Sequence, residues 1–560
     1  MFDQNPIQHT FEHNGTVVSV AEYFARVYGK KITQPKQPLF LVKVAGNDTM
    51  LPTEFCLLDN VPDYVRKSPA MRDALALTRI DPQEKIHRIQ EMVRTLQSQK
   101  AVKDWNIVIE QEPVTMKTNV LGAPTMISDR QLIVCDEKTL RKAAISKAVD
   151  LRKDRWIMVY ENTQRMFDIA DGIFKSLQQA SGQLKIVVED PYWIELSKET
   201  NREELDFKIQ EYMMGSKQFE HPIMCLMVVN RESTYPMFKE VMLQYRIPSQ
   251  VITARNGSKF NLSKATNILR QVNSKSGGDL FYLKFPEKMN GRRTMLIGID
   301  VCHAGPQSIV GFSASINREL SQYYSDYLIQ RKGQEIVVDN MVEPILAAIK
   351  VFAQNHDNEY PEQIVIYRDG VGDAQRNQVL ATEVTQFEEA IYRVYNKMTR
   401  PAIALIVVNK RISQRFFVKD SRGQLQNPPS GCIIDRELVE EHAPDSKQFD
   451  FFLTPSSANQ GCVLPTHFYV SRNDTKLERT ELQHLTYSLC HFYFNWAGPI
   501  KVPAPCQYAH KIAEFYMTIG VNRQRKNKGA QQRECGRQAM ELAQRIERDV
   551  VPINQKLHFL

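Results

Sequence analysis

The stretch "QIVIYRDGVGDAQRNQ", Gln363 to Gln378, puts a charged pair at the end of an apolar run. Its residues 364–367 have the pattern of a buried strand, and Arg368 and Asp369 follow before a glycine-rich turn. An unpaired buried charge is very costly, so a carboxylate at this point needs a physical reason. Either Asp369 caps the turn, or a positive group lies beside it.

A second strand ends in the same way. "TMLIGIDV", residues 294–301, is apolar through Ile299 and then places Asp300. Two central strands that each end on an aspartate can bring both carboxylates to one edge of a sheet. Because two neighbouring anions repel, a bridging divalent cation would relieve them, and oxygen ligands suit Mg²⁺ or Mn²⁺. Two such ions roughly 4 Å apart can activate water and stabilise the leaving oxygen of a phosphodiester.

Two more residues are candidates for the same site. Glu335 in "RKGQEIVVDN" stands at the start of a helix expected over residues 334–354. The positive end of the helix dipole also favours an acid at this position. His510 in "VPAPCQYAHKIAEF" enters a helix after a proline-restricted loop, and neutral histidine is a common metal ligand. The simpler alternatives are turn caps for the two aspartates, a solvated glutamate and a structural histidine, and spacing alone does not decide between them.

The surrounding pattern predicts an α/β multidomain fold. After residue 292, three antiparallel-looking strands, a helix, a strand, a helix and a strand follow the order of a ribonuclease-H-like domain. Before it, strands alternate with helices, which predicts a Rossmann-like parallel sheet covered on both faces. In that block we expect a helix that ends on Gly182 and a strand over residues 183–190.

The totals of the chain limit the function classes. The 560 residues are enough for several domains, and a net charge of +8 is compatible with a polyanionic partner without requiring one. We see no apolar run near the roughly 18 residues of a membrane span and no signal-peptide pattern at the start. The 9 cysteines form no CxxC pair, which favours reduced thiols in a soluble intracellular protein without a membrane partner.

Several long motifs resemble one family. "LIGIDVCHA", "GQEIVVDNM", "VIYRDGVGDAQ" and "LTYSLCHFYFNWAGPIKVPAPCQYAHKIAEF" together resemble the PIWI domain of Argonaute proteins of the PIWI clade, and the similarity extends over nearly the whole chain. The resemblance implies that Asp300, Asp369 and His510 hold two Mg²⁺ ions, with Mn²⁺ as a substitute, and that Glu335 completes the site. The implied reaction is hydrolysis of an RNA strand paired to a small guide RNA, leaving a 3′-hydroxyl and a 5′-phosphate.

The resemblance also implies a pocket for the 5′ end of the guide. Tyr235 and Lys239 are four residues apart and so share one face of a helix. In the family this tyrosine stacks on the first guide base and the lysine meets the 5′-phosphate. Gln250, Gln271 and Lys275 match further phosphate-contacting positions.

Gln271 and the end of the chain imply a metal ion in this pocket. The PIWI clade has glutamine where other Argonautes have lysine, and it is understood to offset the lost charge with Mg²⁺ and the C-terminal carboxylate. Here Leu560 would supply that carboxylate. Phe515, in place of an arginine of other Argonautes, agrees with the same clade. The alternative is that these side chains are ordinary surface residues of amphipathic helices.

The resemblance divides the chain into four parts: a partial PAZ domain over residues 1–60, a linker over 61–150, a MID domain over 151–285 and a PIWI domain over 286–560. We expect the N-terminal domain and the first half of PAZ to be absent, and so assign no pocket for the 3′ end of the guide. The segment 522–551 begins basic and continues as an amphipathic helix with Met540, Leu542 and Ile546 as core contacts. Its alternative role is contact with guide phosphates.

Three functions remain open. The leading one is a Mg²⁺-dependent endoribonuclease guided by a piRNA-like small RNA, cutting complementary target RNA in gene or transposon silencing. The second is a guide-loaded RNA-binding module that recruits silencing factors and cuts little or nothing. The third is an unguided ribonuclease-H-type enzyme. Expected partners are the guide, the target RNA and silencing-complex proteins, in the cytoplasm, the nucleus or both.

Overall fold

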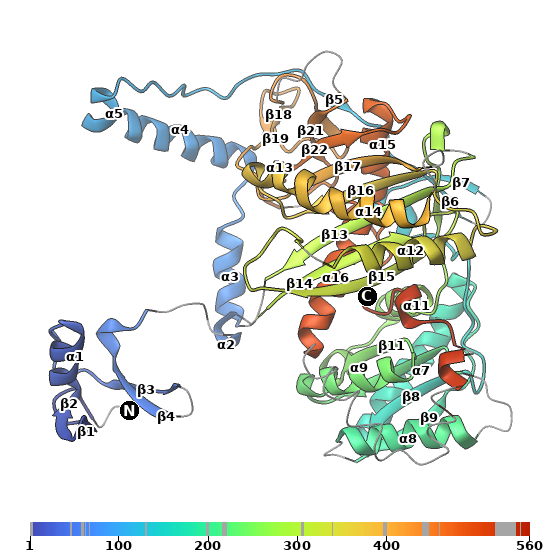
Figure 1. Cartoon of the computed structure of the whole chain (residues 1–560), viewed down its shortest axis with the longest axis horizontal. Helices are drawn as coiled ribbons and strands as arrows, with labels where there is room; N and C mark the ends of the chain where they lie inside the picture. The colour runs from blue at the N-terminus through green and yellow to red at the C-terminus, as the bar shows by residue number, and fades with distance from the viewer. Residues whose placement is uncertain are drawn as a thin grey trace. The chain divides into compact units, whose positions relative to one another are not determined.

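The protein divides into two compact units, Met1–Ile80 and Asp81–Leu560, each described here by itself (Figure 1). The computed structural model describes the chain except for residues 1–3, 45–46, 58–60, 62, 67, 129–130, 198–200, 216–220, 290, 304–306, 339, 396–399, 440–446, 459, 521–541, 543–544 and 549. No helix in the described part of the chain is both long enough and apolar enough to cross a bilayer.

The first unit holds two small hairpins and short helices. Its elements are β1 (Thr10–His13), β2 (Thr16–Ser19), α1 (Val20–Tyr28), β3 (Leu39–Val44), β4 (Asn47–Pro52), α2 (Asp63–Arg66) and α3 (Pro69–Leu77). The side chains of Ser19 and Glu22 form a capping box at the start of α1, and Gly29 ends the helix with φ 63°. Both ends of α1 are therefore fixed by local capping.

A four-stranded parallel sheet forms the first layer of the second unit. Its order is β11-β10-β8-β9. The strands are β8 (Trp156–Glu161), β9 (Tyr192–Leu196), β10 (Met224–Val229) and β11 (Ser249–Thr253), and the main helices are α7 (Gln164–Leu184), α8 (Arg202–Gly215), α9 (Tyr235–Gln244) and α11 (Leu262–Lys275). The predicted Rossmann-like arrangement is confirmed.

The strand predicted over residues 183–190 is wrong. Helix α7 continues to Leu184 and ends at Lys185, which adopts a left-handed conformation with φ 57°. Beyond it the backbone forms an isolated bridge with Leu151, whose N–H donates to the Val187 carbonyl and whose carbonyl accepts from the Glu189 N–H. The strand that pairs with β8 is β9 instead, beyond Pro191.

A nine-stranded sheet forms the larger layer, in the order β15-β14-β13-β16-β17-β22-β21-β20-β5. Its strands are β5 (Asn119–Val120), β13 (Thr294–Cys302), β14 (Ser308–Ser315), β15 (Tyr323–Gln330), β16 (Gln363–Asp369), β17 (Ala402–Asn409), β20 (Cys432–Ile434), β21 (Phe449–Thr454) and β22 (Thr466–Asn473). β13, β14 and β15 pair antiparallel, whereas β13, β16 and β17 are parallel. This is the predicted ribonuclease-H-like order, and β5 joins the sheet edge from the preceding segment.

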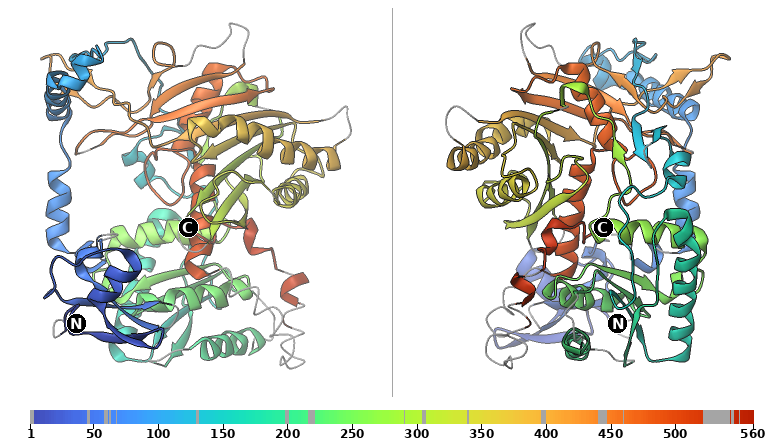
Figure 2. Two further views of the ribbon diagram at one scale, coloured as in Figure 1. Left: turned by 60° about the vertical axis from the view of Figure 1, so that its left-hand side comes forward. Right: turned by 90° about the vertical axis from the view of Figure 1, so that its right-hand side faces the viewer.

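Helices cover both faces of this sheet (Figure 2). On β16, Ile364 and Ile366 pack in a core with α12 (Val342–Gln354) and α14 (Val384–Val394). Val365 and Tyr367 face the opposite core, which includes α15 (Arg479–Cys490) and α16 (Ala504–Ile519). Alternate residues of one strand are therefore buried on opposite faces, as expected for parallel strands covered on both sides.

Helix α16 lies directly on the sheet because two strand positions have no side chain. A Cβ atom on Gly298 would come within 2.1 Å of the Pro505 backbone, and one on Gly311 within 1.8 Å of the Ala509 carbonyl oxygen. Real Cβ atoms do not approach backbone so closely, so both positions require glycine. This close approach fixes the part of α16 that carries His510 over β13 and β14.

The C-terminal segment packs on the parallel sheet. Leu542 and Ile546 are buried in the core formed by β8, β10 and α8, and the Arg246 guanidinium donates to the Val550 carbonyl at 2.7 Å. The core contacts predicted for Leu542 and Ile546 are confirmed. Met540 and most of the basic part of segment 522–551 lie outside the described residues.

Candidate functional site

The sheet register brings the two aspartates side by side. β13 and β16 are parallel, and Ile299 lies opposite Arg368, so the next position pairs Asp300 with Asp369. Both carboxylates face the α16 side of the sheet, because side chains two positions apart on a strand share a face. Gly298, two residues before Asp300, faces Pro505 of α16, and Tyr367, two residues before Asp369, lies in the core that includes α16. The two aspartates are 4% and 0% exposed. The register therefore confirms the prediction that the two strands place Asp300 and Asp369 side by side.

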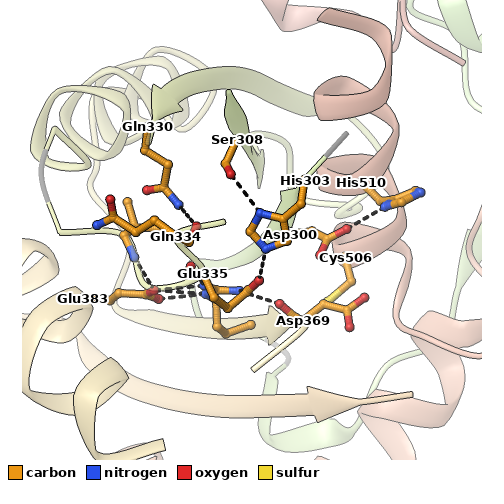
Figure 3. Close-up of polar contacts among 12 residues, drawn as sticks. Asp300, His303, Ser308, Gln330, Gln334, Glu335, Asp369, Glu383, Cys506 and His510 are labelled. Carbon is orange, nitrogen blue, oxygen red and sulfur yellow. Dashed lines mark hydrogen bonds and ion pairs between the residues drawn. The ribbon is translucent and has the colours of Figure 1, made fainter. Parts of the chain in front are cut away.

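His510 joins the pair from helix α16. Its Nδ1 lies 2.6 Å from Asp300 Oδ2, which raises the pKa of His510 through that hydrogen bond (Figure 3). Cys506, one helical turn earlier, is buried beside both aspartates, and burial, with their charges added, raises the pKa of its thiol. Its sulfur is therefore held as a neutral thiol rather than a thiolate ligand.

The positive group beside Asp369 is Lys410, which sequence reasoning missed. Its Nζ lies 2.6 Å from Asp369 Oδ2. Burial and the neighbouring Asp300 raise the pKa of Asp369 to about 6, and Lys410 opposes that rise. Burial lowers the pKa of Lys410, but Asp369 and Asp300 outweigh it, so the net shift is upward. The available signal was its position directly after β17, the strand next to β16.

The donor set fits a divalent cation. Asp369 Oδ1 is buried without a hydrogen-bond partner. Asp300 beside it adds a second carboxylate, and His510, which is bonded to Asp300, adds an imidazole. Two carboxylates and one imidazole match Mg²⁺ or Mn²⁺. Within the described residues no three such groups stand in metal-ligand geometry. His510 bonds Asp300 directly, and Lys410 pairs with Asp369.

Glu335 reaches the same place from a loop and not from a helix start. The predicted helix over 334–354 is wrong in its first part, since α12 begins at Val342. The loop backbone is instead satisfied by side chains: the Glu335 carbonyl accepts from Arg368, and the Met341 N–H donates to Gln386. A Cβ on Gly370 would lie 3.0 Å from Glu335 Oε1 and 3.5 Å from Asp300 Oδ1, so the acids surround one point.

Two residues that were not predicted as members of the site hold Glu335. His303 Nε2 lies 2.7 Å from Glu335 Oε2, and His303 Nδ1 contacts the Ser308 hydroxyl at 2.8 Å (Figure 3). The fully buried Arg368 donates to Glu335 Oε1 at 2.9 Å. Arg368 thus faces away from Asp369, toward α14. Arg368 and Asp369 therefore point to opposite faces of the sheet, as the alternation of side chains along a strand predicts.

A second polar site lies at the start of β11, around Ser249. Lys239 Nζ donates to the Ser249 carbonyl at 2.7 Å and to its hydroxyl at 2.9 Å. Lys275 Nζ donates to the same carbonyl at 3.2 Å and to Gln250 Oε1 at 2.8 Å. Three of the predicted pocket residues therefore meet around one backbone carbonyl.

Both lysine side chains are buried and lie close to each other. They are 3% and 2% exposed. Burial lowers the pKa of Lys239 to about 7, and burial together with the charge of Lys239 lowers the pKa of Lys275 strongly. Burying two positive charges away from water is costly. An anion bound at this point would offset that cost and favour the charged forms of both lysines.

The remaining predicted pocket residues surround the lysines in part. The Tyr235 ring centre is 5.5 Å from Lys239 Nζ, and the Phe515 ring centre is 6.0 Å away. Gln271 Nε2 donates to Asn495 Oδ1 at 2.6 Å. Leu560 packs on the core, and its N–H donates to the Leu557 carbonyl. A metal ion shared by Gln271 and the terminal carboxylate therefore stays a prediction.

The chain end nevertheless lies near the lysines. Burial, with smaller effects from Lys239 and Lys275, lowers the pKa of His558 to about 4. The His558 ring centre is 5.4 Å from that of Phe515 on α16. The tail, α9 and α16 thus meet at the two lysines.

Comparison with known proteins identifies the family. The Piwi domain model matches residues 222–519, and the PAZ domain model matches residues 2–81. The chain belongs to the Piwi family. It is 31% identical over 538 residues to Piwi-like protein 1 of Danio rerio, covering 91% of this chain. It is 32% identical over 553 residues to Piwi-like protein 1 of Gallus gallus, covering 93%. The chain spans 60% of the length of each of these relatives.

Solved structures agree on the fold of this PIWI-clade Argonaute. The crystal structure of Drosophila Piwi superposes with a TM-score of 0.71 at 22% identity, covering 100% of this chain and 71% of that one. Kluyveromyces polysporus Argonaute with a guide RNA gives 0.69 at 19% identity, covering 99% and 65%. The fold class predicted from the sequence is confirmed.

Proposed function

We propose that this protein binds a 5′-phosphorylated, piRNA-like guide RNA and hydrolyses complementary target RNA in RNA-mediated silencing of genes or transposons. The observation that carries the proposal is the juxtaposition of Asp300 and Asp369 at the ends of adjacent parallel strands, with His510 bonded to the first and Glu335 beside both. An anionic substrate needs compensation at such an acidic site, which points to divalent cations.

Asp300, Asp369 and His510 would hold Mg²⁺, with Mn²⁺ as a substitute. Bound there, the ions supply activation of a water molecule and stabilisation of the charge on the leaving oxygen. Glu335 would complete the site from its loop, held at both carboxylate oxygens by His303 and Arg368. Lys410 would release Asp369 to the cations and remain a positive group beside the phosphodiester.

The pocket around Lys239 and Lys275 would bind the 5′-phosphate of the guide. Two buried lysines that donate only to neutral oxygens of Ser249 and Gln250 in their described contacts would gain a charged acceptor. Tyr235 would stack on the first base, a contact typically worth about 1–3 kcal/mol. Gln271 and the Leu560 carboxylate would hold a further Mg²⁺ at the phosphate.

The second candidate is a guide-loaded binding module that recruits silencing-complex proteins without cutting. It requires the lysine pocket at Ser249 but no divalent cation at Asp300, Asp369 and His510. The two candidates share the guide pocket and differ only in what happens to a bound target.

One preparation tests the guide pocket that both candidates share. RNA that copurifies with the protein is sequenced and its 5′ ends are analysed, and binding of synthetic guides with a 5′-phosphate or a 5′-hydroxyl is compared. We expect small RNAs with 5′-phosphates and a preference that Lys275→Met removes, whereas Lys175→Met on the exposed face of α7 retains it. Equal affinity for both guides would exclude guide anchoring and favour an unguided nuclease.

A further inference from the structure

The backbone of the loop that carries Glu335 is hydrogen-bonded by two side chains, Glu383 directly before α14 and Gln386 in α14. The Val337 N–H donates to Glu383 Oε1 at 2.9 Å, and the Met341 N–H donates to Gln386 Oε1 at 2.9 Å. Gln386 Nε2 in turn donates to the Val337 carbonyl at 2.7 Å. Glu383 and Gln386 thus replace the helical hydrogen bonds that this loop lacks.

Glu383 also fixes the arginine that orients Glu335. Arg368 Nε lies 2.9 Å from Glu383 Oε2, and the contact is bidentate through Glu383 Oε1 at 3.1 Å from the terminal nitrogen (Figure 3 labels Glu383 beside Glu335). Arg368 is 0% and Glu383 2% exposed. An arginine bound in this fork has one orientation, so its other nitrogen meets Glu335 in a fixed place.

Glu383 lies in a backbone turn directly before α14. Residues Val379–Glu383 form one π-helical turn between α13 (Arg376–Gln378) and α14. A π turn adds a residue and shifts the faces of the helix that follows, and such turns are frequent at functional sites. Here the π turn ends on Glu383, whose side chain contacts Val337 and Arg368.

We propose that Glu383 and Gln386 are positioning residues that clamp the Glu335 loop in its active arrangement. This inference rests on the proposed cleavage function, but the clamp is a property of the loop that is measurable without it. Glu383 acts through Arg368 on the Glu335 carboxylate, and Gln386 acts on the backbone at Val337 and Met341. Neither side chain touches the reacting groups.

The test uses Glu383→Gln and Gln386→Met in the full chain. Glu383→Gln keeps the size of the side chain but removes the anion that orients Arg368, whereas Gln386→Met removes the backbone bonds. Hydrogen exchange is followed in the peptide over residues 333–341 and in a peptide of β10. We expect faster exchange in the loop peptide alone, and single-turnover cleavage slower by on the order of 100-fold with unchanged target affinity.

Two comparisons distinguish positioning from general destabilisation. Glu383→Asp keeps the charge and should recover part of the rate, whereas Asp450→Asn removes another buried acid, paired with His467 at 2.7 Å, and should leave loop exchange unaltered. Unchanged loop exchange in both clamp variants, or equal acceleration in β10, would overturn the proposal. If the unmodified protein does not cleave, the proposed function fails, while the exchange result still decides the clamp.

Discussion

Raising the pH from 7 to 8 should weaken the binding of a 5′-phosphorylated guide about five-fold or more. In the free protein, burial lowers the pKa of Lys239 to about 7, so the ammonium form that a phosphate requires becomes scarce above that pH. A bound dianion favours the charged lysine and raises its pKa again. Binding therefore takes up a proton between the two pKa values, and affinity falls as the pH rises through this window.

The magnitude follows from the fraction of charged Lys239. With a pKa of about 7, about one half of the side chains are protonated at pH 7 and about one in eleven at pH 8. The ratio gives a loss of about five-fold from Lys239 alone. Lys275, whose pKa is also lowered by burial, steepens the dependence. The guide phosphate does not contribute, since its second pKa is about 6 and it is already a dianion.

The assay is calorimetric titration of the protein with guide RNA at pH 7, 8 and 9, in buffers of different ionisation enthalpy. At pH 8 the buffer dependence should report uptake of about one proton or more for each guide bound. A guide with a 5′-hydroxyl is the control, and its affinity should change much less with pH. Constant affinity from pH 7 to 9 with no proton uptake would refute the role of buried lysines in phosphate binding.

Three further perturbations test other parts of the structure. Lys410→Met should tighten Mn²⁺ binding measured by calorimetry, because the cation that competes for Asp369 is removed; weaker binding would show that Lys410 assists the metal. Gly311→Ala should abolish folded protein in thermal unfolding, because its Cβ would overlap α16, whereas Gly172→Ala in α7 should stabilise by about 0.5–1 kcal/mol; equal melting temperatures would contradict the packing. Tyr235→Ala should weaken guide binding by about 1–3 kcal/mol in filter binding without changing the preference for a 5′-phosphate; loss of that preference would place the ring elsewhere.

The fold was predictable where pattern and burial agree. The run from Ile364 to Asp369 is buried throughout and forms a central strand, and its counterpart ending on Asp300 is its parallel neighbour. Strand order and the acidic pair follow from these two runs. The strand predicted over residues 183–190 failed because an apolar run can complete a helix, as Leu184 does, before the next strand begins.

The parts of the site that sequence reasoning missed depend on distant partners. Lys410 meets Asp369 only because β17 lies beside β16, and His303 meets Glu335 across a loop. Glu335 itself was assigned to a helix because local propensity cannot report that Glu383 and Gln386 satisfy its loop backbone. These contacts join residues many positions apart, and they carry no local pattern.

Cleavage of a matched target shows whether Asp300 and Asp369 act together in RNA hydrolysis. The protein is loaded with a 5′-phosphorylated guide, given a complementary end-labelled RNA and Mg²⁺, and the products are mapped under single-turnover conditions beside Asp369→Ala. We expect one cut per target, leaving a 3′-hydroxyl and a 5′-phosphate. The cut should be lost with chelator or in the variant, while the target stays bound. Stable target binding without any Mg²⁺-dependent product, in a protein whose Asp369→Ala variant behaves identically, would contradict this expectation.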